Sequence, residues 1–214
     1  MKQKSCANLT NMKTFLTLIV LFFSSSVLTD DIADLQIEGM SLGDSLLDHY
    51  TSEEISYPKY YVHEYKNIPF KYYIFDTQPE SIYDYIQITI KIENEYITKS
   101  ENKKLIIHEI KGLIYSFKDM ESCFSKMIDI KNNLEFFFNT TAHEDSGLKS
   151  IDKSGESTHK RFQFYVHPDA IYADAVIQCT DMSKSFEKEG WKDALTVAIN
   201  SQEFIKTLSL YEYQ

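Results

Sequence analysis

Apolar positions change their spacing around the middle of the chain, between residues 104 and 138. The stretch Leu105–Tyr115 is rich in apolar residues and has the length of a strand. The apolar residues after it recur at intervals of three and four, which places them on one face of a helix, and Asp119 stands where an N-cap is needed. These helical positions are Met120, Cys123, Phe124, Met127, Ile130, Leu134, Phe137 and Phe138. We expect this strand and this helix to form the centre of the core.

Short stretches with strand periodicity occur on both sides of this region. The clearest has isoleucine at every second position from Ile86 to Ile92, so one face is buried and the other is wet. The other predicted strands are Asp34–Glu38, Tyr60–Tyr65, Phe70–Thr77, His159–His167, Ile171–Thr180 and Asp193–Ile199. The polar stretches Asn139–Thr158 and Met182–Trp191 are predicted to be irregular.

Shorter helices are expected near the two ends of the chain. Ser41 or Asp44 can cap the first, and Asn200 with Glu203 forms a capping pair for the last. Consecutive strands with few helices between them predict an antiparallel sheet. We therefore expect an α+β fold, in which a central amphipathic helix and shorter N- and C-terminal helices back the sheet.

The first 29 residues have the profile of a signal peptide. Lys13 precedes the apolar run Phe15–Phe23, and small or polar residues follow, so cleavage is expected after Ser26 or Thr29. The run is shorter than the roughly 20 apolar residues of a membrane helix, which makes a membrane anchor the less favoured alternative. We expect a signal peptide over residues 1–29, one domain over residues 30–214, and a periplasmic or secreted protein.

The charge balance excludes one class of partner. The formal net charge is −10, from 22 basic and 32 acidic residues. Nucleic-acid binding needs clustered Lys and Arg, so a nucleic-acid partner is not expected. The sequence also lacks a phosphate-binding loop, and we expect no cofactor.

Two cysteines, Cys123 and Cys179, remain after the predicted signal peptide. An even cysteine count in an exported chain favours a disulfide. Cys123 lies on the apolar stripe of the predicted helix, and Cys179 shares a strand face with Ile171, Ala173, Ala175 and Ile177. Both side chains therefore point into one core if the helix and the strand pack together. Two buried free thiols are the alternative.

Two overlapping serine motifs raise a hydrolase alternative. Gly39–Gly43 fits the G-x-S-x-G pattern, in which Ser41 would be the nucleophile. Gly43-Asp44-Ser45-Leu46 resembles the first block of the GDSL hydrolases, and that resemblance implies a nucleophilic role for Ser45. The resemblance covers four residues, and the family's later Gly-x-Asn-Asp and Asp-x-x-His blocks do not occur in this chain. A glycine-flanked helix cap is the favoured interpretation of both motifs.

The six histidines show no close metal-ligand spacing. His159 and His167 share strand parity with Arg161, Gln163 and Tyr165, so these side chains can line one face. A metal site using His159 and His167 is a weak alternative to a solvated polar surface.

Aromatic residues suggest a binding surface. The chain has 15 Tyr and 14 Phe, and those at 60–61, 72–73, 83 and 85 fall on both parities of the predicted strands. Some of these rings should lie outside the core, as in surfaces that bind carbohydrate, peptide or protein partners. We therefore expect a non-catalytic binding or envelope-interaction module, with an esterase-like hydrolase as the alternative.

Three segments together resemble a family of small exported proteins from marine bacteria with streamlined genomes. They are Asp34–Leu47 behind the signal peptide, Glu121-Ser122-Cys123 opening a helix, and Gln178-Cys179 ending a strand. The resemblance implies export and adds no activity, cofactor or catalytic residue. The Gly-Met-Ser turn is more distantly similar to one in periplasmic α+β modules of outer-membrane assembly lipoproteins and β-lactamase inhibitor proteins, a likeness of shape.

Overall fold

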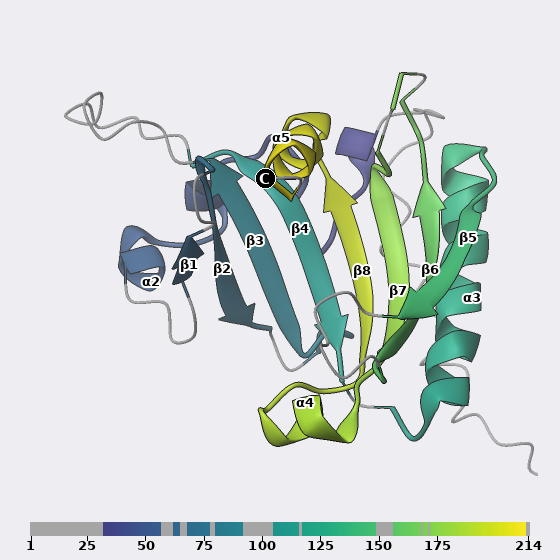
Figure 1. Cartoon of the computed structure of the whole chain (residues 1–214). Helices are drawn as coiled ribbons and strands as arrows, with labels where there is room; N and C mark the ends of the chain where they lie inside the picture. The colour runs from purple at the N-terminus through teal and green to yellow at the C-terminus, as the bar shows by residue number, and fades with distance from the viewer. Residues whose placement is uncertain are drawn as a thin grey trace, which may run out of the picture.

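An antiparallel sheet of eight strands dominates the computed structural model (Figure 1). The structure describes residues 32–56, 62–64, 68–77, 80–91, 105–115, 117–148, 156–167, 169–170 and 172–212. The strands lie in the order β1-β2-β3-β4-β8-β7-β6-β5. Their bounds are β1 Val62–Glu64, β2 Phe70–Asp76, β3 Tyr85–Lys91, β4 Ile107–Ile114, β5 His143–Leu148, β6 Thr158–Phe164, β7 Ala175–Asp181 and β8 Ala194–Asn200. Two four-stranded meanders thus meet where β4 pairs with β8.

The alternation of side chains gives the sheet two different faces. Ile110, Ile177 and Val197 lie on one face, which we call the helix face, and they belong to the main core. Their neighbours along the strands, including Lys111, Gln178 and Thr196, lie on the opposite face, which we call the open face. Apolar residues at every second position therefore explain why the helix face is buried and the open face is not.

Helix α3 (Met120–Phe138) begins and ends where the apolar spacing predicts. The Asp119 carboxylate accepts a hydrogen bond from the Ser122 backbone N–H at 2.8 Å, and Asn139 ends the helix in the left-handed region with φ 47°. Cys123 is fully buried and forms a disulfide with Cys179 on β7. The predicted cysteine pair is thus confirmed.

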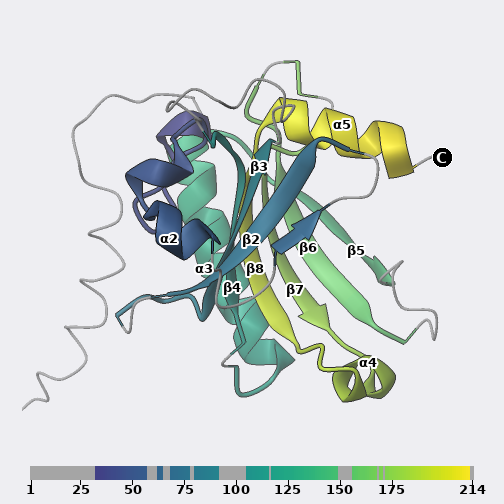
Figure 2. The same cartoon turned by 90° about the vertical axis from the view of Figure 1, so that its left-hand side faces the viewer.

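The predicted α+β fold with a central helix backing the sheet is wrong. The molecule is mostly an antiparallel sheet, and α3 is not central but lies mainly against β7, on one side of the helix face (Figures 1 and 2). The apolar stripe of α3 is also less buried than its spacing suggests, because Phe124 is exposed and Met120, Ile130 and Phe137 are only half-buried.

Residues 32–56 cover the other side of the helix face, in place of the predicted N-terminal helix. They form two short 3-10 turns, η3 (Ile32–Asp34) and η4 (Leu46–Asp48), and the five-residue helix α2 (Ser52–Ser56). Leu46 is completely buried in the main core, and Tyr50 stacks on Phe75 of β2 with ring centroids 3.9 Å apart. Irregular backbone therefore completes the layer over β2, β3 and β4.

Several local predictions are also corrected. The strand predicted at Asp34–Glu38 is replaced by a tight turn in which Ile37 bridges to Met40. The predicted loop Asn139–Thr158 contains β5, and the predicted irregular stretch Met182–Trp191 contains helix α4 (Lys184–Lys188). The first helical turn is capped by Ser45, and the side chain that accepts a hydrogen bond from the first turn of α5 (Gln202–Glu212) belongs to Ser201.

Gly112 of β4 leaves room for the ring of Tyr83. A Cβ atom built on Gly112 would stand 2.3 Å from two carbon atoms of that ring, so no larger residue fits without movement. The register between β3 and β4 shifts between Thr89 and Ile90, as at a β-bulge.

Helices α4 and α5 lie at opposite ends of the open face, away from α3 (Figure 2). α5 is held there by a small second core, in which Phe204 contacts Phe70 of β2 with ring centroids 5.0 Å apart. No helix within the described residues is long and apolar enough to cross a membrane. The predicted signal peptide, residues 1–29, lies outside the described residues.

Candidate functional site

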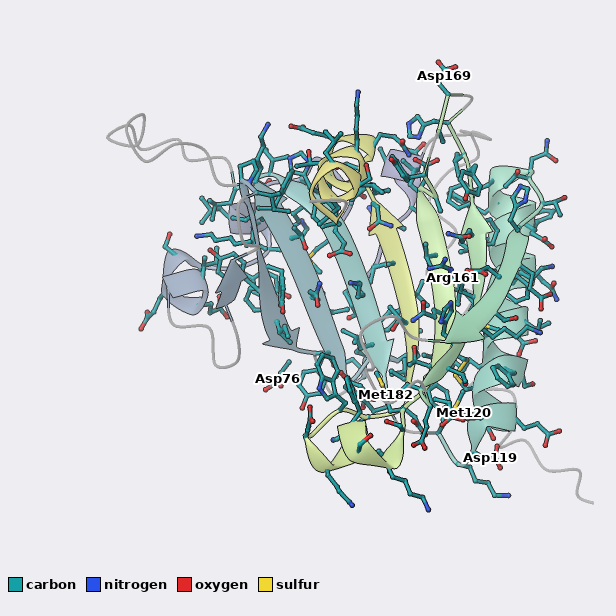
Figure 3. All side chains as sticks on the ribbon, viewed as in Figure 1. Asp76, Asp119, Met120, Arg161, Asp169 and Met182 are labelled. Atoms are coloured by element: carbon teal, nitrogen blue, oxygen red, sulfur yellow. A yellow bond between two sulfur atoms is a disulfide. The ribbon has the colours of Figure 1, made fainter. Side chains whose placement is uncertain are left out.

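The open face carries a trough of about 620 Å³ between α4 and α5. Strand β8 runs along its floor and presents the small side chains Ala194, Thr196 and Ala198. Larger side chains from β3 and β4 line one side, and side chains from β7 line the other. Seven residues of β8 extend about 20 Å, which gives the length of the floor. Figure 3 looks onto this face, with Met182 at the α4 end and Arg161 beside the trough on β6.

A hydrogen-bonded network fixes one wall of the trough. The Glu109 side chain is almost fully buried, and its Oε2 accepts hydrogen bonds from Thr89 Oγ1 at 2.6 Å and Gln87 Nε2 at 3.1 Å. Its Oε1 lies 3.1 Å from Lys111 Nζ. Both carboxylate oxygens are thus satisfied from within the sheet, so the surface offered to a ligand here is that of Gln87 and Lys111.

The opposite wall is ordered in the same way by neighbouring strands. Gln178 Nε2 donates to Thr180 Oγ1 at 2.8 Å along β7. Beside Gln178 in the register, Arg161 of β6 forms an ion pair with Asp145 of β5, with 2.5 Å between nitrogen and oxygen. Burial raises the pKa of Asp145, but the charges and hydrogen bonds of Arg161 and His159 together outweigh it and lower that pKa below its ordinary value.

Asn200 lies at the α5 end of the trough floor, and its side-chain amide faces the trough. The residue is only 7% exposed, yet it lines the trough beside its cross-strand partner Glu109. Its backbone N–H donates to the Asp174 carbonyl, while its side chain makes no hydrogen bond to any described residue. An amide can donate two hydrogen bonds and accept two, so the Asn200 side chain can bond to water or to a ligand in the trough.

Aromatic rings gather at the α4 end of the trough. The rings of Tyr85 and Tyr115 meet edge to face, with centroids 5.7 Å apart, and burial raises the pKa of Tyr115. Lys192 Nζ lies 5.6 Å from the centroid of the Tyr115 ring. Trp191 is half-exposed at the trough and leans on Phe186 of α4, 5.8 Å away. The trough therefore has an aromatic end and an amide-rich end.

The two candidate nucleophiles do not meet a base in the structure. Ser45 Oγ accepts a hydrogen bond from the Leu47 backbone N–H at 3.3 Å, which is the capping role favoured from the sequence. Asp44 binds both the Ser41 backbone N–H and the His49 ring. Within the described residues, neither serine hydroxyl has a hydrogen bond to a histidine, as a nucleophile of this type requires.

A serine and a histidine do meet elsewhere, in a pair that the sequence did not reveal. His108 Nδ1 and Ser201 Oγ are 2.9 Å apart, beside Phe70 and under α5. Glu203 Oε2 lies 4.0 Å from the same Nδ1, so the serine and the carboxylate approach one ring nitrogen instead of opposite ones. A catalytic triad needs both nitrogens. Ser201 Oγ also accepts from the Phe204 backbone N–H, so the pair has a structural role at the start of α5.

The two histidines of the metal hypothesis lie apart. His159 is on β6, with Nε2 3.7 Å from Asp145 Oδ2, whereas His167 lies beyond the end of β6 and its Nδ1 is 2.8 Å from Asp174 Oδ1. In the described part of the chain, no three His, Cys, Asp or Glu side chains are placed to share a metal ion.

The trough itself was missed by sequence reasoning, although a signal was present. In β8, the small residues Ala194, Thr196 and Ala198 alternate with Leu195, Val197 and Ile199. Such alternation of small and large side chains in a central strand leaves a hollow over the small ones. Comparison with protein-family models, with curated proteins and with solved structures finds no match to the chain.

Proposed function

We propose that the chain is an exported, non-catalytic binding module and that a ring-bearing, hydroxyl-rich ligand such as an oligosaccharide lies in the trough. The observation that carries the proposal is Asn200, a largely buried residue whose amide faces the trough and makes no side-chain hydrogen bond to the described residues. Ligand sites characteristically combine a mostly apolar hollow with a few converging polar groups.

The two ends of the trough fit such a ligand in different ways. Tyr115 and Trp191 offer flat apolar surfaces with a polar edge, on which a sugar ring can stack. Gln87, Gln178 and Asn200 can each donate and accept hydrogen bonds, which matches hydroxyl groups that also do both. An extended peptide would instead need an exposed strand edge, and this trough lies on the face of the sheet.

Export is part of the same proposal. The disulfide between Cys123 and Cys179 supports an oxidising compartment, since such bonds persist outside the reducing cytosol. We propose the periplasm or the extracellular medium, which agrees with the signal peptide expected over residues 1–29.

Titration with a neutral oligosaccharide tests the proposed function. Trp191 is the single tryptophan of the chain and stands at the trough, so its fluorescence should respond to cellotetraose. Calorimetry should show that Asn200→Ala weakens this binding about tenfold, the loss of roughly one hydrogen bond. Asn132→Ala, on the exposed side of α3, serves as the control and should bind like the wild type. Absence of binding, or equal weakening by both substitutions, would contradict the proposal.

A further inference from the structure

The accessible charge in the trough is positive, although the chain as a whole is acidic. The trough is lined by two lysines, Lys111 and Lys192, and by one acidic residue, Glu109. Glu109 is 5% exposed, and both of its oxygens are taken up by Thr89, Gln87 and Lys111. Because Lys111 and Glu109 pair with each other, the charge of the lining that is left for a ligand is the ammonium group of Lys192, in a protein with a net charge of −10.

Lys192 is the cation best placed to contact a ligand. Its Nζ lies over the Tyr115 ring, at the aromatic end, and it forms no ion pair with any described residue. The acidic residues that adjoin Lys192 and Tyr115 are engaged with the backbone: Asp193 Oδ1 accepts a hydrogen bond from the Met182 N–H, and Asp84 Oδ2 accepts one from the Tyr115 N–H. The ammonium group of Lys192 is thus held beside the stacking surface without an ion pair to either of these carboxylates.

We infer that the trough prefers a carboxylated sugar, with a ring on Tyr115 and its carboxylate at Lys192. This inference rests on the proposed function and narrows it from hydroxyl-rich ligands to acidic ones. An ammonium group beside an aromatic ring can bind a carboxylate while the ring packs against the sugar, so one unit of the ligand satisfies both groups. The amides of Gln178 and Asn200 remain for hydroxyl groups further along the floor.

The test compares an acidic with a neutral oligosaccharide of the same length. Wild-type protein should bind tetragalacturonate about fivefold more tightly than cellotetraose at low salt. This factor is the gain in affinity expected from one partly exposed ion pair. The preference should disappear as salt rises from about 0.01 M to about 1 M, because screening shortens the reach of the charges from about 30 Å to about 3 Å.

Substitution of Lys192 identifies the residue responsible. Lys192→Gln should bring the ratio of the two affinities close to one. Lys188→Gln, on α4 and outside the trough, removes the same charge and should keep the wild-type ratio. Equal affinities in the wild type, or an unchanged ratio in Lys192→Gln, would overturn the inference while leaving the proposed function intact. Binding of neither oligosaccharide would contradict both.

Discussion

Asp174 is a completely buried carboxylate where β6, β7 and α5 come together. Oδ2 accepts hydrogen bonds from the backbone N–H groups of Val166 and His167, at 2.7 and 3.0 Å. Oδ1 lies 2.8 Å from His167 Nδ1 and 2.6 Å from Gln202 Nε2. Four neighbouring nitrogens thus compensate the burial of the Asp174 carboxylate. Each of these nitrogens depends on the negative charge or the lone pairs of that carboxylate.

Asp174→Asn should therefore be strongly destabilising. The amide nitrogen would face N–H donors and leave buried groups unpaired, at a cost of about 3 kcal/mol in the free energy of unfolding. Urea denaturation measures this change. Asp169→Asn, at the exposed tip of the same connection (Figure 3), is the matched control and should change stability by less than about 0.5 kcal/mol. Similar stability of the two variants would show that the buried network is not needed.

His108 gives the fold a pH dependence. Burial lowers its pKa, and Lys91 acts in the same direction, while Glu203 opposes them. The unfolded chain then binds a proton more readily than the folded chain once the pH falls below about 6.5. Neutral His108 therefore contributes fully to the free energy of unfolding above about pH 6.5. This contribution is lost as the pH falls through the lowered pKa of His108 in the folded state.

His108→Gln should lose less stability than the wild type between pH 7.5 and pH 5.5, because glutamine takes up no proton in this range. Urea denaturation at both pH values gives the comparison. His143→Gln, on the exposed side of edge strand β5, should keep the wild-type pH dependence. An equal pH dependence in wild type and His108→Gln would refute the assignment to His108.

At the scale of single elements, β4 depends on a glycine. Gly112→Ala should force the Tyr83 ring out of its position and lower stability by about 1–3 kcal/mol, the usual cost of overpacking. Gly147→Ala in β5 is the control, since its new Cβ would meet nothing closer than 3.9 Å and should be nearly neutral. Thermal unfolding followed by circular dichroism would separate the two, and equal melting temperatures would contradict this packing.

Helix α3 depends on its covalent link to β7. The bridged cysteines are 56 residues apart, and closing a loop of that size stabilises the folded state by about 4 kcal/mol in the entropic model. Reduction should lower the free energy of unfolding by about that amount, measured by urea denaturation with and without reductant. Alkylation of both thiols in denaturant without reductant would show instead that no bond had formed.

The elements that could be predicted from the sequence are those with a strong period. The isoleucines of β3, the apolar spacing of α3, the strands β6 and β7, and the Cys123–Cys179 pair all follow from which residues must face the core. β5 could not be predicted, because its sequence His143–Leu148 is polar and it pairs with a neighbour on one side only. The position of α3 also could not be predicted, since a period shows which face is buried but not which strands cover it.

At the scale of the whole molecule, function depends on how the two meanders meet. β4 and β8 are distant in sequence but adjacent in the sheet, so Lys111 comes to lie beside Ala198, and Glu109 beside Asn200. α5 then closes one end through Phe204 and a Lys91–Glu203 ion pair, and α4 stands at the other end. None of these residues forms a recognisable motif, so the candidate site emerges only once the strand order is known.

A heteronuclear NMR titration of isotope-labelled protein with cellotetraose tests the central claim most directly. If the trough is the binding site, the amide shifts that move will belong to β3, β4, β7 and β8, together with the Trp191 indole N–H. If the moving signals belong instead to the exposed side of α3, around Phe124, Ile128 and Phe136, or if no signal moves, the trough is not the site that we propose.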